Sequence, residues 1–114
     1  MLREKAFLHY MLLAAERVVR STANITRAGF DADDEKRDSV VLQIGNIGEA
    51  ASNVSESFQK EHPEIPWKRI IGMRHHIFHA YHQIDWDIVW DTATIFVPEL
   101  VRLLKPLCPP EDSV

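Results

Sequence analysis

Residues 40–58 read V-V-L-Q-I-G-N-I-G-E-A-A-S-N-V-S-E-S-F, and this stretch decides the fold. Its apolar residues recur every three or four positions, a heptad-like spacing that lets one helix pack against two neighbours. Gly45 and Gly48 interrupt this series of apolar residues. Each costs a helix about 1 kcal/mol relative to alanine, and a glycine here often permits close approach of another helix. We predict one long helix over residues 34–61, with its seam formed by Val40, Ile44, Ile47, Ala51, Val54 and Phe58.

Helical spacing of apolar residues also predicts a first helix over residues 2–23, which stops at Asn24. The acidic segment D-A-D-D-E at residues 31–35 then precedes the long helix. An aspartate cap followed by acids in the first turn is one interpretation, because carboxylates favour a helix N-terminus. A cation-binding loop is the other, but such a loop needs glycine and a longer set of ligands.

Prolines divide the second half of the chain. Pro63 ends the long helix, and Pro66 opens a third predicted helix over residues 67–83. Asp85 is a good cap for a fourth helix that runs to residue 107. Pro98 removes one backbone donor from this helix and predicts a kink or restart near residues 94–96.

No alternating strand pattern appears in the sequence. Short connections between helices therefore predict an all-α fold, an antiparallel bundle of four to five helices. We expect a single domain over residues 1–108 and a short frayed tail over residues 109–114.

Composition limits the classes of function. The chain has 114 residues, a net charge of −4 with neutral histidines, and one cysteine, Cys108. A single cysteine forms no disulfide within the chain, which fits a reducing compartment. No apolar stretch approaches the roughly 20 residues of a membrane helix, so we expect a cytoplasmic protein without a membrane segment. An acidic chain that binds nucleic acid must do so through a local patch.

Residues 74–81, R-H-H-I-F-H-A-Y, concentrate the chemistry of the chain. On an ideal helix, Arg74 lies in the middle of the apolar face of the third predicted helix. A buried guanidinium needs an acidic partner, or a polar cleft or interface, and Glu49 on the long helix is the candidate partner. This position alone fits an internal ion pair as well as it fits a functional arginine.

The histidines of this run admit three interpretations. His75 and His79 lie four residues apart and His82 follows, so they could share a metal ion, although the H-E-x-x-H pattern is absent. They could also be solvated surface residues, or take part in acid–base chemistry, for which histidine has a suitable pKa. On one straight helix Arg74 and His79 diverge by about 140°. A small site that uses both residues therefore favours a cleft formed with a second copy of the chain.

The run resembles the R-x4-H-x-Y motif of HepT-like HEPN proteins, with Arg74, His79 and Tyr81 in the three fixed positions. His75 is compatible with the polar residue that follows the arginine in such proteins. The resemblance covers most of the chain, and the further matching segments occur in the same order. They are I-G-E-A at 47–50, H-P-E-I-P-W at 62–67, I-I-G-M-R at 70–74, I-V-W at 88–90 and P-E-L at 98–100.

The resemblance implies a homodimeric, metal-independent endoribonuclease that needs no cofactor, with an all-α fold of HEPN type. Arg74 would hold the scissile phosphate, and His79 would transfer a proton at the ribose 2′-hydroxyl or the leaving oxygen. His75 and Glu49 would support the site. In-line attack by the 2′-oxygen would leave a 2′,3′-cyclic phosphate, a reaction that DNA cannot undergo.

The resemblance also implies a toxin of a type VII toxin–antitoxin pair. Its partner would be a minimal nucleotidyltransferase antitoxin, which neutralises the toxin by transferring AMP to Tyr81. An alternative function is a non-catalytic HEPN module that binds a nucleotide or a nucleotidyltransferase. A histidine-based metal protein is a third hypothesis.

Overall fold

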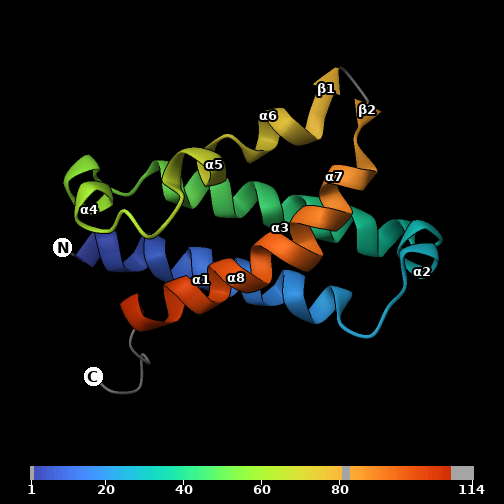
Figure 1. The fold of residues 1–114 in the computed structure, drawn as a ribbon, viewed down its shortest axis with the longest axis horizontal. Helices are drawn as coiled ribbons and strands as arrows, with labels where there is room; N and C mark the ends of the chain where they lie inside the picture. Colours follow the sequence, from blue (N-terminus) through green and yellow to red (C-terminus); the bar gives the residue numbers. More distant parts are fainter. Residues whose placement is uncertain (1, 81–82, 109–114) are drawn as a thin grey trace.

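Two long antiparallel helices form the body of the molecule. The computed structural model describes residues 2–80 and 83–108. Helices α1 (Leu2–Thr22) and α3 (Asp34–Ser52) lie side by side, and the short helix α2 (Arg27–Asp31) lies in the connection between them (Figure 1). The C-terminal helix α8 (Val97–Leu104) packs on α1. The predicted all-α class is confirmed, and the arrangement is of HEPN type.

The predicted boundaries at the first connection are largely confirmed. Asn24 has a positive φ of 62°, a conformation that ends a helix. Asp33 caps α3, because its carboxylate accepts a hydrogen bond from the Lys36 amide at 3.0 Å. Helix α2 was not predicted from the sequence. Thr26 begins it, since its hydroxyl accepts from the Gly29 amide at 3.0 Å.

The single long helix predicted over residues 34–61 is wrong, because the chain breaks between α3 and α4 (Glu56–Glu61). Ser52 and Asn53 both donate from their side chains to the Glu49 carbonyl, at 2.7 and 2.9 Å. Such local bonds compete with the helix ladder. Ser55 then caps α4, and the Glu4 carboxylate accepts from its amide and hydroxyl at 2.7 and 2.8 Å. These hydrogen bonds, the backbone one foremost, lower the pKa of Glu4 and tie α4 to the start of α1.

The third predicted helix, residues 67–83, is also wrong in its second half. It consists of α5 (Trp67–Ile71) and α6 (Met73–Ile77), followed by a small antiparallel hairpin of β1 (Phe78–Ala80) and β2 (Gln83–Ile84). Gly72 separates the two helices, and a Cβ there would lie 3.2 Å from the Lys68 carbonyl oxygen. The Asp85 amide donates to the Ile77 carbonyl at 2.9 Å and closes the base of the hairpin.

The fourth helix starts and bends as predicted. The Asp85 carboxylate accepts from the Ile88 amide at 3.0 Å and caps α7 (Trp86–Asp91). A π-helical turn, η1 (Thr92–Phe96), joins α7 to α8, and Pro98 follows directly. The missing donor of Pro98 explains why the α-helical ladder is irregular before it. The short 3-10 turn η2 (Lys105–Leu107) ends the described chain near Cys108.

The core lies between α1, α3 and α8, with α5 packed on α3. Gly48 makes the α3–α5 contact close, since a Cβ at this position would lie only 3.1 Å from the Ile70 carbonyl oxygen. The expected role of glycine in close helix packing is thus confirmed for Gly48. The fully buried core side chains include Met11, Val18, Phe30, Val40, Ile44, Ile47, Ile70, Val97 and Leu104.

Candidate functional site

Arg74 lies on α6, and its side chain is exposed. It borders an open hollow of about 520 Å³ between α3 and the α6–hairpin segment. In Figure 1 this segment extends away from the paired helices α1 and α3. The predicted place of Arg74 in the middle of an apolar face is therefore wrong. The hollow is lined by Asp38, Val41, Leu42, Gly45, Asn46, Glu49, Arg74, Phe78 and Ile84.

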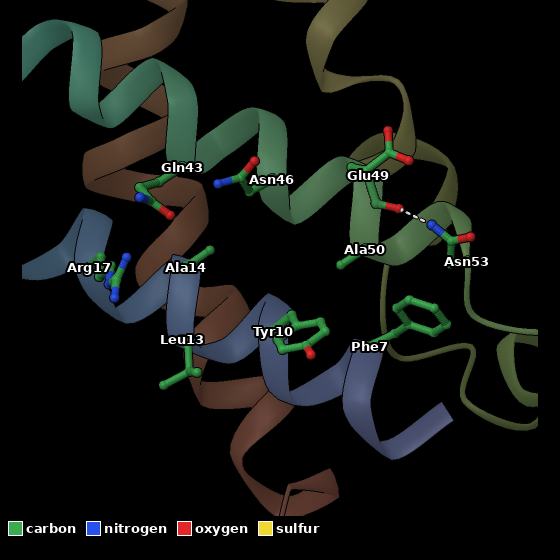
Figure 2. Close-up of a pocket in the computed structure, with 10 residues that line it drawn as sticks. All are labelled: Phe7, Tyr10, Leu13, Ala14, Arg17, Gln43, Asn46, Glu49, Ala50 and Asn53. Atoms are coloured by element: carbon green, nitrogen blue, oxygen red, sulfur yellow. Dashed lines mark hydrogen bonds between the residues drawn. The ribbon is translucent and has the colours of Figure 1, made fainter. Parts of the chain in front are cut away.

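Glu49 lines the same hollow as Arg74, but the predicted ion pair between them is absent. Glu49 is exposed on α3, and among the described residues no ion pair joins the two side chains. In Figure 2 the carboxylate of Glu49 points away from α1. Arg74 thus presents its guanidinium to the hollow without a carboxylate bound to it in the described structure, which leaves its donors open to an anionic ligand.

His79 is the middle residue of β1 and lies two residues beyond Ile77, the last residue of α6. The angular separation of Arg74 and His79 on one helix therefore does not apply, because the chain changes from helix to strand between them. Tyr81 and His82 lie outside the described residues.

His75 is exposed on α6, and because α6 ends at Ile77, His75 and His79 are not one helical turn apart. The helical spacing that suggested a shared metal ion is lost at this point. Within the described part of the chain, no three His, Cys, Asp or Glu residues form a group that could hold a metal ion.

A second hollow, which the sequence analysis missed, runs between α1 and α3 and has a volume of about 390 Å³. Phe7, Tyr10 and Leu13 of α1 line it, and Figure 2 shows the polar side chains of Asn46 on α3 and of Asn53 just after α3 on the opposite side. Tyr10 is 58% exposed and Leu13 is 44% exposed. The sequence signal for this surface was that Tyr10 and Leu13 lie on α1 next to the buried apolar residues Met11 and Leu12. Asn46 and Glu49 line both hollows, so the two hollows are neighbours on the outer face of α3.

Cys108 is half-buried at the end of the described chain. Burial, with a smaller contribution from the nearby Glu16 carboxylate, raises the pKa of its thiol to about 11. Because the thiolate is the nucleophilic form, a thiol with this pKa is a poor nucleophile at neutral pH.

The HepT-like ribonuclease family model matches residues 11–107, and the chain belongs to this family. It is 32% identical over 96 residues to "Probable ribonuclease HepT" of Thermococcus cleftensis, covering 84% of this chain and 87% of the relative. It is 29% identical over 103 residues to "Putative RNase TTE0752" of Caldanaerobacter subterraneus subsp. tengcongensis, covering 90% of this chain and 92% of the relative.

No solved structure matches the chain significantly. In the part of the chain that the structure describes, none of the helices combines the length and the apolar character needed to cross a membrane. The resemblance stated from the motif residues is thus confirmed at the level of the family.

Proposed function

We propose that this protein is an endoribonuclease toxin that cleaves RNA without a metal ion. Its family and the names of its relatives support the class of reaction. The observation that carries the proposal is the exposed guanidinium of Arg74, unpaired among the described residues, beside an open hollow and five residues before His79 on β1. A cation at the edge of an open hollow suits an anionic polymer better than a small neutral ligand.

In this proposal Arg74 and His79 are the catalytic residues. Arg74 binds the non-bridging oxygens of the scissile phosphate and stabilises the charge that grows on them. The ribose 2′-oxygen attacks phosphorus, and the bond to the 5′-oxygen breaks. His79 transfers the proton at one of these two oxygens. The products are a 2′,3′-cyclic phosphate and a 5′-hydroxyl. Glu49 and His75, both exposed near Arg74, support substrate binding in the hollow and at its edge.

The proposed active form is a homodimer. The hollow between α1 and α3 exposes Tyr10 and Leu13, and the adjoining hollow exposes Leu42 and Phe78. Burying such apolar surface against a second copy stabilises an assembly by roughly 25 cal/mol per Å². Because Asn46 and Glu49 line both hollows, a copy seated on α1 and α3 would border the hollow of Arg74. The site would then be shared between protomers.

The proposed partner is a nucleotidyltransferase antitoxin that transfers AMP to Tyr81. An adenylate adds bulk and negative charge two residues from His79, which would repel the RNA phosphate. Co-expression with a candidate antitoxin and intact-mass measurement tests this step. A mass increase of one AMP that disappears in Tyr81→Phe supports it, and an unmodified chain together with normal neutralisation contradicts it.

The first experiment on the enzyme is expression of the chain alone in a bacterial host, followed by mapping of RNA ends. We expect growth arrest and new 2′,3′-cyclic phosphate ends, both lost in Arg74→Ala and in His79→Ala. Arg20→Ala is the matched control, because Arg20 is an exposed arginine on α1 that lines neither hollow. Circular dichroism shows whether each variant is folded.

Cleavage that persists in both site variants would remove these residues from the catalytic role. Intact RNA with well-folded parent protein would contradict the ribonuclease proposal and favour a non-catalytic binding module. Purified protein is also assayed with EDTA. Activity that EDTA abolishes and that added metal restores would contradict the metal-independent mechanism.

A further inference from the structure

A third hollow of about 400 Å³ lies between the α5–α6 segment and the α7–η1 segment. Arg69 and His76 are its exposed basic residues. Arg74 and His76 are two positions apart on α6, which turns their side chains roughly 200° apart around the helix. This hollow is therefore separate from the one that contains Arg74. Its lining consists of Arg69, Met73, His76, Ile88, Thr92 and Phe96.

Arg69 is positioned by an aromatic ring. Its guanidinium carbon lies 4.0 Å from the centroid of the Phe96 ring, a cation–π contact. No carboxylate among the described residues forms an ion pair with it, whereas Arg27, Arg37 and Arg102 are each paired with an acid. Stacking on Phe96 occupies the face of the guanidinium and leaves the N–H groups at its edge available. A stacked guanidinium of this kind is oriented to bind a phosphate through two donors.

The π-helical turn η1 forms the opposite wall of this hollow. It contributes Thr92 and Phe96, both nearly buried. π-helical turns of this type often occur at functional sites, because the extra residue changes the direction of side chains. Among the described residues, no acidic residue lines the hollow. The sequence also has no acidic residue between Glu64 and Asp85, although the whole chain has a net charge of −4.

We propose that Arg69 and His76 form a second phosphate site, which binds a backbone phosphate of the RNA strand beyond the scissile one. This inference rests on the proposed function. An RNA strand carries a phosphate at every nucleotide, and Arg69 on α5 and Arg74 on α6 lie on consecutive short helices that only Gly72 separates. One strand that crosses α6 from one side to the other would reach both hollows. Arg69 is thus a substrate-binding residue outside the catalytic pair.

Binding of a fluorescein-labelled single-stranded RNA of mixed sequence tests the site, with the His79→Ala chain as the background so that cleavage does not intervene. We expect Arg69→Gln to weaken binding about tenfold at low salt and to reduce the slope of log K against log salt by about 0.7, the loss of one phosphate contact. Arg69→Lys should restore part of the salt dependence, because it retains the charge. Arg20→Gln, the same charge change on α1, should bind as the background does.

Equal RNA affinity of Arg69→Gln and Arg20→Gln would overturn the inference. Titration with AMP and with inorganic phosphate, followed by NMR, distinguishes the sources of the phosphate. Loss of AMP binding in Arg69→Gln with unchanged RNA affinity would also overturn it, because the hollow would then serve a free nucleotide.

Cleavage by the chain with His79 intact is measured separately. Unchanged KM and kcat for long RNA in Arg69→Gln would contradict the second phosphate site and leave the ribonuclease proposal intact. If the chain with His79 intact binds RNA through Arg69 but does not cleave it, the ribonuclease proposal is contradicted and the second phosphate site is supported. A raised KM with unchanged kcat in Arg69→Gln supports both.

Discussion

At the scale of the residue, Arg74 shows why exposure matters more than position in a pattern. On an ideal helical wheel it shares a face with Ile70 and Ile77, and those two side chains are indeed buried. Arg74 is exposed because α5 ends at Ile71 and α6 restarts at Met73. A guanidinium in this place costs the fold little and remains available to a ligand.

We therefore expect Arg74→Gln and Glu49→Gln each to change the free energy of unfolding by less than about 0.5 kcal/mol, as is usual for exposed positions. Loss of one partner of a buried ion pair would instead cost about 3–5 kcal/mol. Urea unfolding of both variants and of the double variant measures the difference. A large loss in each single variant that is not additive in the double variant would show that the two side chains are paired after all.

At the scale of the element, two glycines of α3 have opposite surroundings. A Cβ at Gly48 would lie 3.1 Å from the backbone of α5, whereas a Cβ at Gly45 would meet nothing within 4 Å. Gly45 instead borders the hollow of Arg74. Gly48 thus allows the close packing of α3 on α5. The packing of the single chain does not require a glycine at position 45.

The two alanine variants should move stability in opposite directions. Gly45→Ala should stabilise the fold by about 0.5–1 kcal/mol, since alanine has the better helix propensity and space is open. Gly48→Ala should destabilise it by about 1–3 kcal/mol, because the contacted atom belongs to the backbone of α5 and cannot turn aside. Thermal and urea unfolding measure both changes. Equal stabilisation by the two substitutions would contradict the close α3–α5 contact.

At the scale of the whole molecule, the outer face of α1 and α3 is the main unpartnered apolar surface that bears on the proposed function. Its exposed apolar residues adjoin the Arg74 hollow through Asn46 and Glu49. The exposed Ile95 on η1 lines none of the three hollows described above, so it provides a matched apolar position elsewhere.

We expect the parent chain to be a dimer in sedimentation equilibrium, and Leu13→Glu to convert it into a monomer with little RNA cleavage. A buried unpaired carboxylate opposes association strongly. Ile95→Glu should remain dimeric and active. A monomeric parent that cleaves RNA, or a Leu13→Glu variant that stays dimeric, would contradict the proposed interface.

The sequence by itself determined the all-α class, an aspartate cap within residues 31–35, the cap at Asp85, the irregularity before Pro98 and the family. These depend on local chemistry, namely which side chain satisfies a helix end, which residue lacks an amide, and which short motifs recur in order. Only the tertiary structure decided where the longer helices break, that Arg74 is exposed, and which hollows adjoin it. Those outcomes depend on contacts between distant segments, such as Glu4 with Ser55, Gly48 with Ile70, and Arg69 with Phe96. No periodicity within a single segment reports such contacts.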